Sequence, residues 1–125
     1  MSRWLIAGSR SWDAKRAMFA TLDHMVESHG MPDEIIHGGA KGADTFAGEW
    51  ADHREIPVTV YDADWAQYGK AAGIIRNNIM LDTKPDVVIL FISGQSRGTK
   101  HTLAGAQSRG IEFHVFVNKN IAPLA

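Results

Sequence analysis

Two glycine-rich segments of this chain carry the residue types that bind phosphate. Residues 37–44 read HGGAKGAD, residues 93–100 read SGQSRGTK, and an apolar-striped segment follows each of them. A helix N-terminus has unpaired backbone N–H groups and about half a positive charge, and glycine lets such a backbone approach an anion closely. The two segments therefore predict two anion-binding turns, each at the start of a helix.

Other polar residues in comparable positions complete the predicted binding site. Arg76 lies in a helical segment, from which its guanidinium is able to grip a phosphate or a carboxylate bidentately. Asp44 either bonds ribose hydroxyls or caps the helix that follows the first turn, and Trp12 and Trp65 either stack on a base or pack in the core. The full set of candidate ligand-binding residues is Gly8, Ser9, Arg10, Gly38, Gly39, Lys41, Gly42, Asp44, Arg76, Asn77, Gly94, Ser96, Arg97, Gly98 and Thr99.

A purely structural role is the alternative for each glycine-rich segment, because tight turns also favour glycine. The segment GSRSWD (8–13) lacks the G-x-G-x-x-G dinucleotide fingerprint, and residues 94–100 lack the spacing of a P-loop. The six histidines show no H-E-x-x-H or other ligand spacing, so neither a metal nor a cofactor is expected.

The periodicity of the chain predicts the elements that must position these residues. Short apolar runs indicate strands at 4–8, 34–38, 56–62, 86–93 and 112–118. Helical apolar spacing occurs at 13–28, 42–54, 70–82 and 99–109. This alternation predicts an α/β fold, a three-layer Rossmann-like sandwich in which helices cover both faces of a five-stranded parallel sheet. In such a sheet the loops after the strands meet at one edge, where ligands bind.

Composition excludes several classes of protein. With 125 residues, the chain is expected to form a single domain over 1–125. It has no cysteine, which excludes a disulfide framework and a thiolate nucleophile, and a net charge of −1 gives no general attraction to nucleic acid or to an anionic membrane. The first apolar run is too short for a signal peptide, and no run approaches the ~18 residues of a membrane span. A cytoplasmic protein with no membrane partner is expected.

Four segments in this order resemble the SLOG superfamily, named for the Smf/DprA and LOG proteins, and most closely its YspA/YpsA-like branch. They are GSRSWD (8–13), HGGAKGADTFAGEWA (37–51), DADWAQYGKAAGIIRNNIM (62–80) and SGQSRGTKHTLAGA (93–106). The resemblance implies a Rossmann-like fold that binds a nucleotide or a nucleotide-derived molecule such as AMP, ADP-ribose or an NAD-related compound. It also implies that a homodimer can form, since relatives often dimerise through helix faces.

The resemblance leaves three functions to compare. A sensor or binding module for such a ligand is favoured. The alternative is a hydrolase of a nucleotide N-glycosidic or phosphate bond, because Arg76 and Gly98–Thr99 resemble the Arg and the G-T of the LOG pattern; Arg76 and Asp44 would then be the catalytic residues. The catalytic Glu of that pattern falls on Thr102, which lacks a carboxylate. A single-stranded DNA module, as in the DprA relatives, is not expected, because no basic and aromatic stripe accompanies the net charge of −1.

Overall fold

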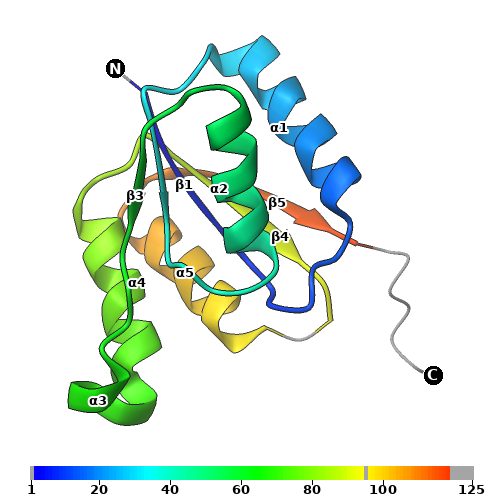
Figure 1. Ribbon diagram of the computed structural model, residues 1–125. Helices are drawn as coiled ribbons and strands as arrows, with labels where there is room; N and C mark the ends of the chain where they lie inside the picture. Colours follow the sequence, from blue (N-terminus) through cyan, green and yellow to red (C-terminus); the bar gives the residue numbers. More distant parts are fainter. Residues whose placement is uncertain (1, 95, 119–125) are drawn as a thin grey trace.

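The computed structural model describes residues 2–94 and 96–118, which form a three-layer α/β sandwich (Figure 1). The strands are β1 (Arg3–Gly8), β2 (Glu34–His37), β3 (Val58–Val60), β4 (Val87–Ile92) and β5 (Glu112–Val117). The helices are α1 (Lys15–His29), α2 (Ala43–His53), α3 (Trp65–Tyr68), the 3₁₀ turn η1 (Gly69–Ala71), α4 (Ala72–Asp82) and α5 (Arg97–Ser108). The predicted fold class is confirmed.

The direction in which successive strands are added to the sheet reverses between β1 and β4, which is the switch point of the fold. All strand pairs are parallel, and the strand order is β3-β2-β1-β4-β5. The chain therefore moves outward from β1 through β2 to β3, crosses back to β4 on the other side of β1, and ends at β5. In sheets of this kind the crevice beyond the carboxyl ends of the two central strands is the usual ligand site. Here those strands are β1 and β4.

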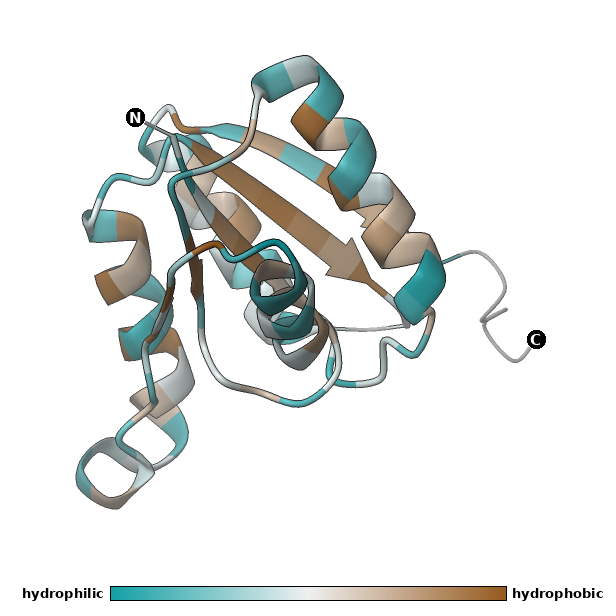
Figure 2. Ribbon diagram, turned by 45° about the horizontal axis from the view of Figure 1, so that its top comes forward, coloured by the Kyte–Doolittle hydropathy of each residue, from teal (hydrophilic) through white to brown (hydrophobic). Residues whose placement is uncertain are grey.

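Each face of the sheet has its own core. On one face Trp4 and Ile6 of β1 pack with residues of α1 and α2, and Trp4 stacks on Trp50 with 6.0 Å between ring centroids. On the other face Leu5 and Leu90 pack with residues of α4 and α5. Because both faces are covered, the apolar residues of β1 and β4 lie in the middle layer between helices (Figure 2). Within the described residues, no helix is long and apolar enough to cross a membrane.

The structure differs from the predicted elements around residues 62–82. Residues 65–71 form α3 and η1, an arm that projects beyond the sheet (Figure 1). A loop was expected as far as residue 69, with a helix from residue 70. Ile79, one of the apolar residues that give 70–82 its helical spacing, is 49% exposed, because α4 turns Met80 and Leu81 toward the sheet instead. The third strand is shorter than predicted, since β3 is an edge strand whose pairing with β2 covers only Val58–Val60.

Gly8 allows three elements to meet at the end of β1. A Cβ at this position would overlap the carbonyl oxygen of Phe91 in β4 and would lie 2.7 Å from the Cβ of Ala43 in α2. The close approach of β1, β4 and the start of α2 therefore requires the absence of a side chain.

Replacing Gly8 with alanine should lower the free energy of unfolding by about 1–3 kcal/mol, because neither backbone nor core is free to move aside. The matched control is Gly98→Ala in the first turn of α5, where a Cβ would meet no atom within 4 Å. That change should be neutral or slightly stabilising, since alanine favours helix by up to about 1 kcal/mol. Urea unfolding of the two variants measures the difference, and equal stability would contradict this role of Gly8.

Candidate functional site

A cleft of about 630 Å³ opens where β1 and β4 end, at the switch point of the sheet. It is bounded by the loop after β1, by α3 and α4, and by the first turns of α5. Its volume falls within the ~300–1,000 Å³ that is usual for small-molecule sites. The predicted site residues that line it are Gly8, Ser9, Arg10, Asp44, Arg76, Asn77, Ser96, Arg97, Gly98 and Thr99.

The other predicted residues lie outside this cleft. Gly38 and Gly39 line an adjoining cavity of about 300 Å³. Lys41, Gly42 and Gly94 line neither cavity. Gly42, with φ of 76°, lets α2 begin directly under the first loop, since a Cβ there would lie 2.5 Å from a carbonyl oxygen of the loop after β1. A glycine is therefore required at this position so that the start of α2 can pack against the loop after β1.

The turn at residues 38–40 does not offer its backbone N–H groups to a ligand. The N–H groups of Gly38 and Ala40 donate to Oδ2 of Asp44 at 3.1 and 3.2 Å. The N–H of Gly39 donates to Nδ1 of His37 at 3.0 Å, and burial lowers the pKa of that imidazole, which favours the neutral acceptor. Within the predicted 38–42 turn, the protein's own side chains thus occupy the N–H groups of residues 38–40, whereas those of Lys41 and Gly42 have no partner among the described residues. Binding of a phosphate by this turn stays a prediction.

Gly38 instead makes room for the guanidinium of Arg76. Nη1 of Arg76 donates to the carbonyl oxygen of Gly38 at 2.6 Å, and Nε donates to Oδ1 of Asn77 at 2.9 Å. A Cβ on Gly38 would lie 2.7 Å from Cζ of Arg76. Nη2 has no hydrogen-bond partner among residues 2–94 and 96–118, and the side chain lines both cavities. Arg76 is thus held by two of its nitrogens, and the third is available to an anion.

Asp44 is a buried carboxyl group at the wall of the cleft. It is 5% exposed and lies inside the first turn of α2, where it bonds the preceding turn and does not act as the N-cap, a position that Gly42 occupies. Burial raises its pKa from 3.8 to about 6, against the opposing effects of the N–H groups of Ala40 and Gly38 and of the charges on Arg76 and Arg10. Only Oδ2 is used by the described backbone, which leaves Oδ1 for a ligand.

The loops after β1 and β4 are joined to each other and to α5. Oγ of Ser9 accepts a hydrogen bond from the N–H of Ser93 at 2.9 Å, and the hydroxyls of Ser11 and Ser93 lie 2.8 Å apart. Ser96 is the N-cap of α5, and its Oγ accepts from the N–H of Thr99. The N–H groups of Arg97 and Gly98 have no partner among the described residues. The N-terminus of α5 thus retains the donors that the 38–40 turn has lost.

Sequence reasoning missed the contribution of α3 and η1. Trp65, for which stacking on a base and core packing were both considered, is 51% exposed and lines the cleft, with the guanidinium of Arg10 6.0 Å from its ring centroid. Trp12 is instead a core residue, 5% exposed. The sequence signal for the start of α3 is Asp64, a residue type that favours the N-cap position, and its Oδ1 accepts a hydrogen bond from the N–H of Gln67. The lining residues not singled out as binding residues are Ala7, Ser11, Ala40, Trp65, Lys70, Gly73, Ile74, Met80 and Thr102.

The charge of the cleft differs from that of the whole chain. The described lining residues include four cations, Arg10, Lys70, Arg76 and Arg97, and a single carboxylate, Asp44. The chain as a whole carries −1. A local excess of positive charge between low-dielectric walls concentrates anions, so the cleft is suited to a negatively charged ligand.

Two comparisons with known proteins agree with this architecture. The family described as YAcAr, the YspA, cpYpsA-related SLOG family, matches residues 3–68, from β1 to the end of α3. The Gene 61 protein of Mycobacterium phage D29 is 35% identical over 124 residues, which cover 95% of this chain and 99% of the phage protein. The chain therefore belongs to the YspA, cpYpsA-related SLOG family.

Proposed function

We propose that the cleft binds a nucleotide or a nucleotide-derived ligand, of the type of AMP, ADP-ribose or an NAD-related molecule, and that the protein acts as a sensor or binding module. The observation that carries the proposal is the set of cationic side chains gathered at the switch point around one carboxylate and one exposed tryptophan. Membership of a SLOG family also suggests nucleotide-related binding or processing.

Each part of such a ligand has a suitable partner in the cleft. A phosphate would be held by Nη2 of Arg76 and by the N–H groups of Arg97 and Gly98, which have no partner among the described residues, and the dipole of α5 would add to the attraction. Oδ1 of Asp44 is placed to accept from a ribose hydroxyl. The exposed ring of Trp65 offers a face on which a base stacks, in the way that aromatic side chains hold unpaired bases.

Hydrolysis is the second candidate, and one observation favours it. A carboxyl group whose pKa lies near 6 is suited to protonate a leaving base, as the general acid of glycosidases does. The rest of the cleft favours binding. Thr102, in the position of the LOG glutamate, is buried and donates its hydroxyl to the carbonyl oxygen of Gly98. Among the described residues, no second carboxylate lines the larger cleft, and Asp62 lines only the smaller cavity.

Arg76→Ala should weaken binding of AMP, ADP-ribose or NAD by about 10- to 100-fold, because a hydrogen bond to a charged group contributes about 1.5–3 kcal/mol. Adenosine, which has no phosphate, should bind the variant and the native protein alike. Isothermal titration calorimetry measures both. The control is Arg16→Ala, an exposed arginine of α1 that lines neither cavity. If no phosphate-bearing ligand binds the native protein, the proposal is wrong.

Gly38→Ala tests whether the lack of a side chain at residue 38 sets the position of the Arg76 guanidinium. The added methyl group displaces the guanidinium, the mobile end of a long side chain, so stability should change by less than about 1 kcal/mol. Phosphate affinity should nevertheless fall. Because both changes act on one group, the double variant of Gly38→Ala and Arg76→Ala should bind no more weakly than Arg76→Ala alone. Additive losses in this calorimetric cycle would show that Gly38 acts on the ligand by another route.

Asp44→Asn tests the carboxyl group in two ways. A carboxyl whose pKa is raised by folding contributes most below its unfolded pKa of 3.8, and this contribution is lost as the pH rises toward about 6. Urea unfolding should therefore show native stability falling relative to Asp44→Asn, by on the order of 1–2 kcal/mol between about pH 4.5 and about pH 7. A constant difference would contradict the raised pKa.

The same variant separates the two candidate functions. Under the binding proposal, chromatography after incubation with nucleoside monophosphates should show no released base for either protein. Release of a base by the native protein, abolished by Asp44→Asn, would replace the sensor by a hydrolase that uses Asp44 as its acid.

A further inference from the structure

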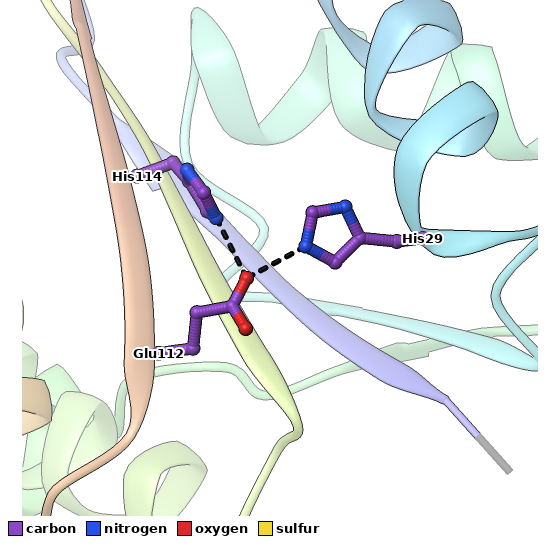
Figure 3. Close-up of side chains that lie close together, drawn as sticks. All are labelled: His29, Glu112 and His114. Atoms are coloured by element: carbon purple, nitrogen blue, oxygen red, sulfur yellow. Dashed lines mark hydrogen bonds and ion pairs between the residues drawn. The ribbon is translucent and has the colours of Figure 1, made fainter.

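Three side chains meet at the end of the sheet opposite to the cleft (Figure 3). His29 is the last residue of α1, and Glu112 and His114 lie on β5, whose first residue pairs with the first residue of β4. Oε2 of Glu112 lies 2.6 Å from Nε2 of His29 and 2.7 Å from Nε2 of His114. The cluster is remote from the residues that line either cavity.

The two imidazoles converge on one oxygen atom of Glu112. Both imidazoles direct Nε2 at the same carboxylate oxygen, as Figure 3 shows, and the other oxygen of Glu112 receives neither. Their three ligand atoms all lie within 4.8 Å of one another. Ligands at about 2.1 Å from a tetrahedral zinc ion are separated by about 3.4 Å, so each Nε2 would have to move less than about 1 Å from Oε2 to admit the ion. The two Nε2 atoms, which lie within 4.8 Å of each other, would also have to reach that separation. Two imidazole nitrogens and a carboxylate oxygen are a donor set that zinc prefers.

His29 is already oriented for such a role. Its Nδ1 lies 2.7 Å from Oγ of Ser28, and that hydroxyl donates its own hydrogen to the carbonyl oxygen of Met25. The serine oxygen is therefore free to accept from Nδ1–H, so that Nε2 is the nitrogen that would bind a metal once it gives up the hydrogen that it shares with Glu112. This is the outer-shell hydrogen bond that metal-bound histidines make. The ring also stands edge-on against the fully buried Trp4, at 6.4 Å between centroids, which fixes its plane.

Two further features suit a cation at this position. The carboxyl ends of the α1 peptide dipoles lie at His29, where positive charge is favoured. The side chains remain partly open to solvent, at 24% exposure for His29 and 35% for His114, which leaves room for a water molecule as fourth ligand.

We propose that His29, Glu112 and His114 form a zinc site, with water in the fourth position, that fastens the end of α1 to the edge strand β5. The site differs from the expectation that the chain binds no metal. That expectation rested on helical spacings such as H-E-x-x-H. Glu112 and His114 share a face because they are two apart on a strand, and His29 joins them from 83 residues away.

The test uses the full chain without a histidine tag, freed of metal with a chelator. Titration with Zn²⁺ should give one site per chain, and Co²⁺ in its place should give the visible absorption of a tetrahedral complex. At a free zinc concentration a hundredfold above the Kd, Tm should rise by about 10 °C, because zinc binds the folded chain.

Matched variants locate the site. His114→Gln should lower zinc affinity by more than the roughly 10- to 100-fold expected of the outer-shell change Ser28→Ala. The control is His24→Gln, because His24 is also a histidine beside a glutamate, but on the exposed face of α1 at 81% exposure. His24→Gln should leave zinc affinity unchanged. Glu112→Gln serves as a second ligand variant if His114→Gln does not fold.

The proposal is overturned if the native chain shows no saturable binding of Zn²⁺ or Co²⁺. It is also overturned if His24→Gln and His114→Gln lower the affinity equally, or if Glu112→Gln and His114→Gln both leave it unchanged. The result does not depend on the ligand of the cleft, since the titration contains no nucleotide.

Discussion

The buried carboxylate of Asp44 is the group on which the candidate site depends. By accepting from the N–H groups of Gly38 and Ala40 it fixes the turn after β2, and the carbonyl oxygen of Gly38 then holds the guanidinium of Arg76. An anion inside α2 thus positions a cation on α4, although the two helices cover opposite faces of the sheet. The cost of burying Asp44, evident in its pKa of about 6, is offset in part by the N–H groups that it binds and by the neighbouring arginines.

The two ends of the sheet have opposite electrostatic character. At the carboxyl ends of β1 and β4, the N-terminus of α5 and four cationic side chains favour an anion. At the other end, the C-terminus of α1 meets Glu112 between two histidines, an arrangement that suits a cation. Parallel strands with returning helices produce this polarity, because each helix that connects two strands begins near the carboxyl edge of the sheet and ends near the opposite edge. The net charge of −1 is a sum over the whole chain and therefore indicates neither region.

The sequence predicted the fold well because its signals are local and repeated. The fully apolar run VVILFI (87–92) is typical of a strand covered on both faces, and the spacing of Phe46, Ala47, Trp50 and Ala51 is typical of an amphipathic helix. The same reasoning placed most of the lining residues at one edge. It did not foresee the contact between Gly38 and Arg76, because a glycine needed to admit Arg76 looks the same in sequence as one needed to admit a phosphate. It did not include Lys70 among the binding residues, since α3 and η1, the short elements that bring this part of the chain to the cleft, were not predicted.

The number of carboxylates in the cleft is the strongest argument about its chemistry. Glycosidic hydrolysis ordinarily uses two, one to protonate the leaving group and one to stabilise or attack the sugar, at separations of about 5–9.5 Å. The described part of the larger cleft supplies Asp44, while Thr102 uses its hydroxyl within α5. Under the proposed function, several groups of the cleft would hold phosphate and only one would transfer a proton, so bound ligand and transition state would be stabilised alike. Such uniform binding would give affinity without rate, which is what a sensor requires.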